Sequence, residues 1–151
     1  MNTLREEKRL AYRLIAHWKK LQKGKGLPDI RQFSPAAIGD MWQHCIRLLV
    51  TENNNVRLYK YEHIGPNIVA ALGKDLTGHQ VTPSIRTVPG ANIIRKLDLS
   101  IPLHEPVMEQ GQFINHNDKI IKYRSCILPF GDINYALSHA VIGLSWKVVG
   151  D

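Results

Sequence analysis

The run "GPNIVAALGKDLTG" at residues 65–78 looks like a phosphate-binding loop, because lysine, aspartate and threonine lie between its last two glycines. A Walker-type loop places lysine and then serine or threonine directly after the second glycine, where the ammonium group reaches the phosphates. Here a histidine and a glutamine follow that glycine, so the run does not predict a phosphate site. Instead, we expect Gly73 to end a helix over 66–72, and Asp75 or Thr77 to cap the next turn.

The histidines and cysteines show no metal-binding pattern. None of the seven histidines forms the H-x-x-x-H or H-E-x-x-H spacing, and Cys45 and Cys126 match no metal or redox motif. We interpret both cysteines as reduced thiols and expect no bound metal. His63 and His139 fall inside predicted strands, from which they could line a pocket.

Residues that could serve as catalytic groups are also poorly placed. Ser125 and Cys126 lie in the middle of a predicted strand, where a nucleophile would lack the turn that forms an oxyanion hole. The 13 aspartates and glutamates fall mostly in predicted turns and helix ends, which leaves few candidates for acid–base catalysis. The sequence therefore predicts a protein that is not an enzyme.

The formal net charge of +7 favours an acidic partner such as a nucleic acid or an anionic membrane surface. Basic residues gather near the N-terminus: Arg13, Lys19, Lys20, Lys23, Lys25 and Arg31. No helix-turn-helix, zinc-finger or RNP-type pattern accompanies them, so nucleic-acid binding is kept as an alternative. No apolar run is long enough for a membrane span, and no signal-peptide core is present, which predicts a cytoplasmic protein.

An amphipathic helix is predicted over residues 3–23. Its apolar residues recur at helical spacing and form one stripe: Ala11, Leu14, Ile15, Trp18 and Leu21. Such a stripe must be covered, either by the sheet of the same chain or by a second copy. We assign it to packing and dimerisation.

The remaining patterns predict an α+β fold, with a five-stranded antiparallel sheet and helices on one face. The predicted helices are 34–41, 66–72 and 82–100, the last broken at Pro89 and Gly90. The predicted strands are 44–50, 56–64, 107–116, 119–130 and 133–149. In the last strand, alternation places Leu137 and Val141 on one face and Ala140, Ile142 and Leu144 on the other.

The order of elements resembles a PAS domain, and the sequence is similar to a short, stand-alone bacterial PAS-like family. The similarity is carried by "AHWKKLQKGKGLPDIRQFSP" and by the "GKDLTG" motif, Gly73, Lys74, Asp75, Leu76, Thr77 and Gly78. It implies an N-terminal helical segment at 1–26, a PAS-like domain at 27–151, and a sensory or protein-interaction role. The sequence departs from the family pattern at Pro66 and at Met41-Trp42, so no family ligand can be carried over.

A ligand pocket is expected between the sheet and residues 66–100. The predicted pocket residues are Tyr61, His63, Ile68, Leu72, Ile94, Leu97, Tyr123, Ser125 and His139. We predict a non-enzymatic PAS-like regulatory domain that forms a homodimer, binds a protein signalling partner and accommodates a small-molecule ligand. The sequence identifies no cofactor. A basic nucleic-acid-binding domain and a nucleotide-binding receptor are the alternatives.

Overall fold

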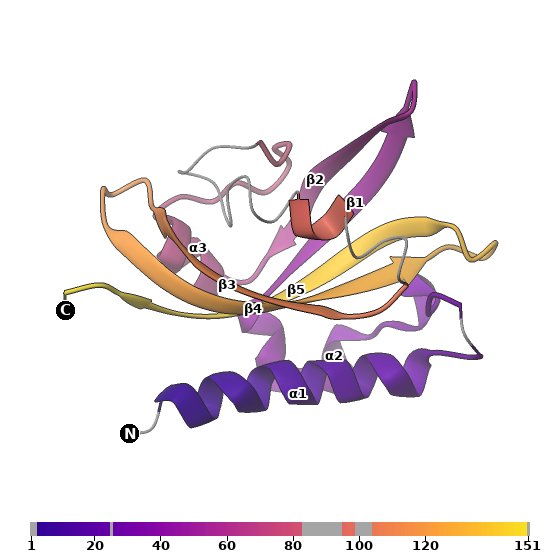
Figure 1. The fold of residues 1–151 in the computed structure, drawn as a ribbon, viewed down its shortest axis with the longest axis horizontal. Coiled ribbons are helices and arrows are strands. Elements are labelled where there is room, and N and C mark those ends of the chain that lie inside the picture. The colour runs from indigo at the N-terminus through magenta and orange to yellow at the C-terminus, as the bar shows by residue number, and fades with distance from the viewer. Residues whose placement is uncertain (1–2, 25, 83–94, 99–103, 151) are drawn as a thin grey trace.

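The computed structural model describes residues 3–24, 26–82, 95–98 and 104–150, with side chains from residue 10 onward in the first helix. One sheet separates two helical layers (Figure 1). Helix α1, Thr3–Leu21, lies along one face, together with α2, Pro35–Ile38. Helix α3, Pro66–Leu72, and a helical turn at 95–98 lie on the other face.

The sheet confirms the predicted five-stranded antiparallel α+β architecture. Its strands are β1 (Cys45–Asn53), β2 (Val56–Ile64), β3 (Val107–Ile114), β4 (Ile120–Gly131) and β5 (Leu137–Val148), in the order β2-β1-β5-β4-β3. The β1–β2 hairpin turns at Asn54 and Asn55, which have φ of 51° and 66°. Asparagine tolerates this left-handed conformation better than most residues, so the turn signal was readable from the sequence.

The apolar stripe of α1 is covered by the sheet of the same chain. Leu14 and Trp18 are almost fully buried, and the Trp18 Nε1–H donates a hydrogen bond to the Pro129 carbonyl at 2.6 Å. A Cβ atom at Gly143 would lie 2.3 Å from Leu14 Cδ1, so a glycine is needed for this close approach. Ala11 is buried as well, whereas Ile15 and Leu21 are half-buried. Its own sheet is one of the two coverings predicted for the stripe, so the assignment to packing is confirmed. Ala11, Leu14 and Trp18 are not exposed for dimerisation, which corrects that part of the assignment.

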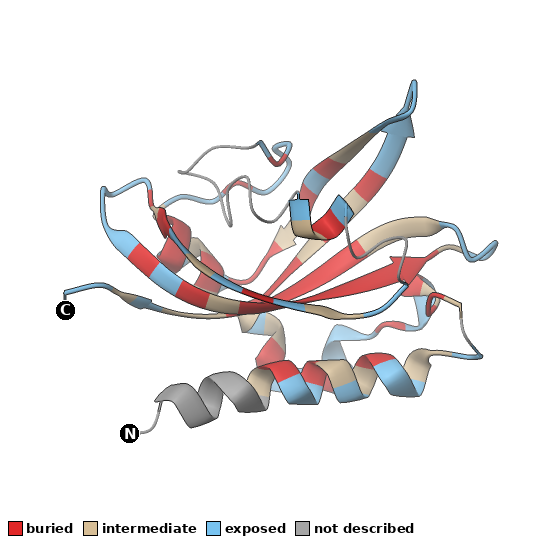
Figure 2. Cartoon of the chain, viewed as in Figure 1, coloured by how far each residue is buried: buried red, intermediate tan, exposed pale blue. Residues whose placement is uncertain are grey.

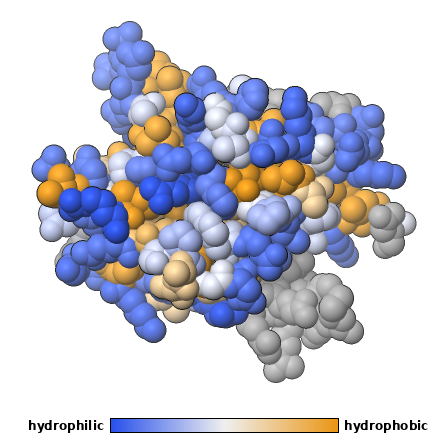
Figure 3. Space-filling model, turned by 180° about the vertical axis from the view of Figure 1, so that it is seen from behind, coloured by the Kyte–Doolittle hydropathy of each residue, from blue (hydrophilic) through white to orange (hydrophobic). Residues whose placement is uncertain are grey.

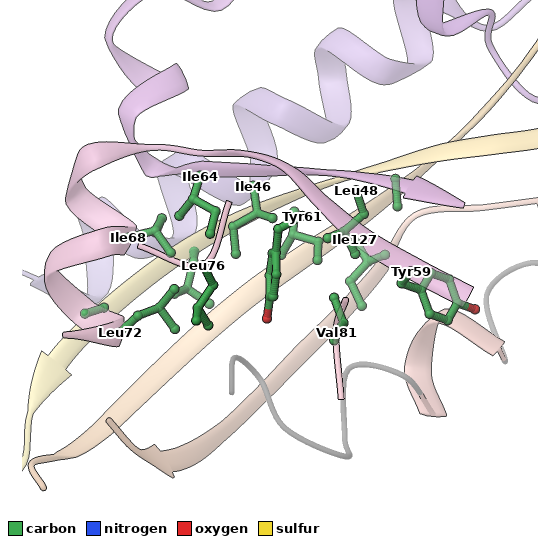
Figure 4. Close-up of a cluster of buried hydrophobic side chains, with 14 of the residues drawn as sticks. Ile46, Leu48, Tyr59, Tyr61, Ile64, Ile68, Leu72, Leu76, Val81 and Ile127 are labelled. Atoms are coloured by element: carbon green, nitrogen blue, oxygen red, sulfur yellow. The ribbon is translucent and has the colours of Figure 1, made fainter. Parts of the chain in front are cut away.

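Two apolar clusters lie on either side of the sheet. Figure 2 shows buried residues along the central strands and on the helices that pack against them. The α1-side cluster contains Ala11, Leu14, Trp18, Ile30, Phe33, Ile38, Met41, Cys45, Cys126, Leu128, Phe130 and Val141. The α3-side cluster combines inward-facing residues of all five strands with α3, and part of it is drawn in Figure 4. The sheet is thus buried on both faces, as expected for strands that are apolar on both sides.

The "GKDLTG" run has the structural role that its residue types predict. Gly73 is left-handed, with φ of 74°, and its N–H bonds to the Val69 carbonyl at the end of α3. The Asp75 carboxylate accepts hydrogen bonds from the Thr77 N–H at 2.9 Å and from the Thr77 hydroxyl at 2.6 Å. Gly78, with φ of 88°, reverses the chain. The turn after α3 is therefore closed by local hydrogen bonds within the motif.

Several element boundaries differ from those predicted. Helix α1 ends at Leu21, and the predicted helix 34–41 is a short α-helix followed by a 3-10 helix, Gly39–His44. β5 begins at Leu137 because the Asp132 carboxylate accepts the Asn134 and Ala136 N–H groups and holds 132–136 as a turn. Of the predicted helix 82–100, residues 95–98 are helical, and 83–94, 99 and 100 lie outside the described residues.

The space-filling view shows a largely hydrophilic surface with small groups of exposed hydrophobic side chains (Figure 3). Among the described residues, exposed large apolar or aromatic side chains include Ile133, Tyr135 and Tyr12. Among the described helices, none is both long enough and apolar enough to cross a membrane.

Candidate ligand-binding site

A buried carboxylate lies on the α3 side of the sheet, between β3 and β4. Glu109 is paired directly with Ser125, and only 8% of Glu109 is exposed. The Tyr123 hydroxyl donates a hydrogen bond to Glu109 Oε1 at 2.9 Å. The Ser125 hydroxyl lies 3.3 Å from the Glu109 backbone carbonyl and 3.4 Å from Oε2. We call Glu109, Tyr123 and Ser125 the Glu109 group.

Burial shifts the protonation of this group. Removal from water raises the pKa of Glu109, and the hydrogen bonds from Tyr123 and Ser125, with the charge of Lys96, oppose that rise. Burial also raises the pKa of Tyr123, and the nearby carboxylate adds to the effect. The phenol therefore stays a donor, and the carboxylate takes up a proton more readily than an exposed glutamate does. A carboxylate has about four acceptor positions, so Glu109 has capacity beyond these two side-chain donors.

Space for the Tyr123 hydroxyl depends on a glycine in the neighbouring strand. Gly111 pairs with Tyr123, and a Cβ atom at Gly111 would lie 2.9 Å from the hydroxyl oxygen. Such a separation is shorter than real Cβ contacts, so any larger residue would displace the phenol. Gly111 thus fixes where Tyr123 can meet Glu109.

The helical turn at 95–98 is tied to the same face of the sheet. Leu97 is 1% exposed and belongs to the α3-side cluster. The Tyr59 hydroxyl donates to Asp98 Oδ1 at 2.5 Å, and the Arg57 guanidinium lies 3.4 Å from the same oxygen. Burial raises the pKa of Tyr59, and the Asp98 carboxylate adds to this rise, so the phenol stays protonated. These contacts hold the helical turn against β2, the edge strand opposite β3, and the charge of Lys96 in the same turn acts on Glu109.

The structure brings most of the predicted pocket residues to this face. Those in the α3-side cluster are Tyr61, Ile68, Leu72, Leu97 and Tyr123, and Ser125 belongs to the Glu109 group. The cluster residues shown in Figure 4 point towards one another from β1, β2, β4 and α3. The five predicted residues in this cluster are 2% exposed or less, so side chains of the chain itself fill much of this interior. Ile94 lies outside the described residues.

His63 and His139 lie on the opposite face, which corrects their assignment to the pocket. Arg47 and Leu48 of β1 pair with His63 and Tyr61 of β2. Glu62 is therefore an extra residue in β2 and forms a β-bulge. The bulge turns His63 towards Trp42, on which its ring stacks at 4.3 Å. His139 pairs with Phe130 of the α1-side cluster, and its Nε2 lies 3.4 Å from Glu62 Oε1.

A second bulge corrects the predicted facing of β5. The register shifts between Phe130 and Gly131, where Gly131 pairs with Leu137 and Phe130 pairs with His139. Leu137 consequently packs against the α3-side cluster, whereas Val141 belongs to the α1-side cluster. The two residues therefore do not share a face.

Glu109 is not among the site residues predicted from the sequence, although a signal for it was present. Within β3, alternation places Glu109 on the same face as Phe113, which is buried. Met108 and Gln112 lie on the other face and are exposed. A charged residue on the buried parity of a strand needs partners. This pattern could have singled out Glu109, but not its partners Tyr123 and Ser125.

Metal and thiol chemistry find little support in the described part of the chain. Within it, no three histidine, cysteine or acidic side chains come together to hold a metal ion. Cys45 and Cys126 are both buried in the α1-side cluster, and burial raises the pKa of Cys126 to about 12. A thiol with so high a pKa is a poor nucleophile near neutral pH.

No protein-family model matches the sequence, and neither does any curated protein. Solved structures of photoreceptor domains do match the fold. A light-oxygen-voltage (LOV) domain studied with a flavin analogue has a TM-score of 0.55 and 7% identity, covering 78% of this chain and 87% of that one. The light-state dimer of the fungal blue-light photoreceptor Vivid has a TM-score of 0.51 and 13% identity, covering 76% and 86%. A variant of Vivid has a TM-score of 0.51 and 11% identity, covering 88% of this chain and 93% of that one. This chain therefore has the PAS fold that the sequence resembles.

Proposed function

We propose that this protein is a non-enzymatic sensory or regulatory PAS domain that binds a small molecule on the α3 side of its sheet. The observation that carries the proposal is the Glu109 group, a buried carboxylate with two hydroxyl partners at the edge of an apolar interior. Ligand pockets are mostly apolar, with a few polar groups that fix the ligand's orientation. The Glu109 group has this composition.

A ligand that donates a hydrogen bond suits this group best. The Glu109 carboxylate can accept such a bond in addition to the one from Tyr123. Binding would favour the charged carboxylate and change how Tyr123 and Ser125 are held between β3 and β4. Because β4 also pairs with β5, which contacts α1, this change could pass from one face of the sheet to the other.

Assembly and partners belong to the same proposal. The light-state structure of Vivid is a dimer, and we propose that the present chain also forms a homodimer and signals to another protein. Because the stripe of α1 is covered by its own sheet, the homodimer would use a different surface. Membership of the short bacterial PAS-like family, with 1–26 as an N-terminal segment and 27–151 as the PAS-like domain, is also proposed.

Native mass spectrometry of the purified full chain is the first test, because it reports bound ligand and oligomeric state together. Thermal-shift assays with flavin mononucleotide, haem and ATP follow, since a ligand that binds only the folded state raises the melting temperature. ATP also tests the alternative of a nucleotide receptor. Co-purification of a small molecule, or a shift with one of these probes, is the expected result.

Two variants connect any such binding to the proposed site. Glu109→Gln should reduce the ligand-induced shift, whereas Glu105→Gln, which changes an exposed carboxylate close by in sequence, should leave it intact. Equal shifts in both variants would overturn the assignment of the site. A chain that carries no small molecule and responds to none of the probes would overturn ligand sensing.

A further inference from the structure

The two edges of the sheet differ in how their backbone groups are satisfied. Part of β2, at one edge, is covered by residues 78–81 of the same chain. The Tyr61 N–H donates to the His79 carbonyl at 2.9 Å, and the Gly78 N–H donates to the Tyr61 carbonyl at 2.7 Å. Strand β3 lies at the other edge, where it pairs with β4 (Figure 1). β3 therefore has one row of backbone groups that points away from the sheet.

The register shows which residues of β3 form this row. The Asn115 N–H donates to the Lys119 carbonyl at 2.8 Å, so the backbone of Asn115 points towards β4. Hydrogen-bonded and non-hydrogen-bonded pairs alternate along an antiparallel ladder, so every second residue of β3 bonds to β4 and the others face outwards. The outward-facing residues are Met108, Gln110 and Gln112. Among the described residues, none outside the sheet forms a hydrogen bond with their backbone groups.

β3 lacks the features that usually prevent an edge strand from pairing with another chain. Such strands are normally protected by lysine, by proline, by a bulge or by being very short. β3 is 8 residues long, pairs with β4 without a register shift, and contains neither lysine nor proline. Its charged residue, Glu109, is already buried on the α3 side with Tyr123 as its donor, so pairing at the edge would bury no new charge.

The side chains at this edge suit a second copy of the chain. Gln110 and Gln112 are exposed and uncharged, so two copies can meet here without like charges facing each other, although each chain has a net charge of +7. Beside them, Met108 and Tyr12 are 49% and 61% exposed, and both line the hollow between α1 and the sheet. A second copy at the edge would cover part of this apolar surface.

We propose that β3 pairs antiparallel with β3 of a second copy, so that the two sheets become one continuous sheet. The pairing rests on the homodimer proposed above and assigns it a surface. A two-fold axis makes the contact self-complementary, since the same outward-facing residues are then supplied by both copies. The Glu109 group, which β3 shares with β4, would lie next to this interface.

Sedimentation equilibrium of the full chain measures the dimer, and Gln110→Pro tests the edge. Proline lacks an N–H and is tolerated in an edge strand where that N–H faces solvent, so the variant should fold as a monomer but lose a bond to the other copy. We expect its dissociation constant to rise at least about tenfold. Gln110→Lys, which places two lysines at the interface, should have the same effect and tests the proposal if Gln110→Pro fails to fold. Gln80→Lys, the same change at an exposed position on the covered edge, is the matched control and should dimerise normally.

Amide hydrogen exchange followed by NMR locates the interface directly. The amides of Met108, Gln110 and Gln112 should exchange more slowly as the protein concentration rises through the dissociation constant, because pairing protects outward-facing N–H groups. A dimer with the same dissociation constant in Gln110→Pro, Gln110→Lys and the native protein would overturn the edge assignment and leave the homodimer standing. A chain that stays monomeric at every concentration would overturn the homodimer itself, and the pairing with it.

Discussion

Replacing Tyr123 with phenylalanine should destabilise the protein through one atom. The substitution keeps the ring, which packs in the α3-side cluster, and removes the hydroxyl that donates to Glu109 Oε1 at 2.9 Å. Hydrogen bonds to charged groups contribute about 1.5–3 kcal/mol, and a buried acceptor that loses its donor costs a similar amount. We therefore expect the free energy of unfolding to fall by about 2 kcal/mol at neutral pH.

The loss should depend on pH in a defined direction. Burial holds the pKa of Glu109 above its unfolded value, so the stability from its protonated form is full below the unfolded pKa and is lost as pH rises through the folded pKa. The hydrogen bond from Tyr123 lowers the pKa of Glu109 in the folded protein, so Tyr123→Phe should raise that pKa further. Each additional pKa unit makes the loss of stability at high pH about 1.4 kcal/mol larger. The difference between the native protein and the variant should therefore widen as pH rises from below the unfolded pKa of about 4.5 towards neutral.

Urea unfolding followed by circular dichroism from pH 4 to pH 8 measures this difference. Tyr135→Phe, which removes a hydroxyl from an exposed ring, is the matched control and should change stability little. In a Glu109→Gln background the pH dependence of the Tyr123→Phe effect should disappear, because no carboxylate remains to titrate. A Tyr123→Phe loss that is the same at every pH, or unchanged in the Glu109→Gln background, would refute the reasoning.

Two further perturbations test the α1 side of the sheet. Gly143→Ala should lower the melting temperature strongly, because its Cβ atom would lie 2.3 Å from Leu14 Cδ1, whereas Gly26→Ala, with its nearest contact at 3.6 Å, should not. An unchanged melting temperature for Gly143→Ala would mean that α1 does not pack as described. His63→Phe should keep the stacking on Trp42 and weaken the loss of stability in acid. Burial lowers the pKa of His63, so its contribution is complete above the unfolded pKa of about 6.5 and is lost as pH falls through the lower pKa of the folded state. Equal acid sensitivity of the urea midpoint in the native protein and in His63→Phe would contradict this assignment.

The sequence by itself determined the elements that depend on local signals. Asn54 and Asn55 marked the first hairpin, and Pro66 with Gly73 marked both ends of α3, because these residue types favour the backbone angles that turns and helix ends require. The alternation within the strands was also enough to give an antiparallel sheet between two apolar layers. The PAS fold followed from the order of these elements.

Only the tertiary structure decided which side chains share a face and which groups meet. His63 and Leu137 changed faces because each lies next to a β-bulge, and a bulge is a mismatch between two strands that neither strand reveals alone. The apolar stripe of α1 could have packed on its own sheet or on a second copy. The close approach of Leu14 to Gly143 in β5 shows that it packs on its own sheet. Glu109 became a candidate site through Tyr123, 14 residues away, and through burial, which depends on the whole fold. Desolvation is a property of everything packed around a group, so no local pattern can fix it.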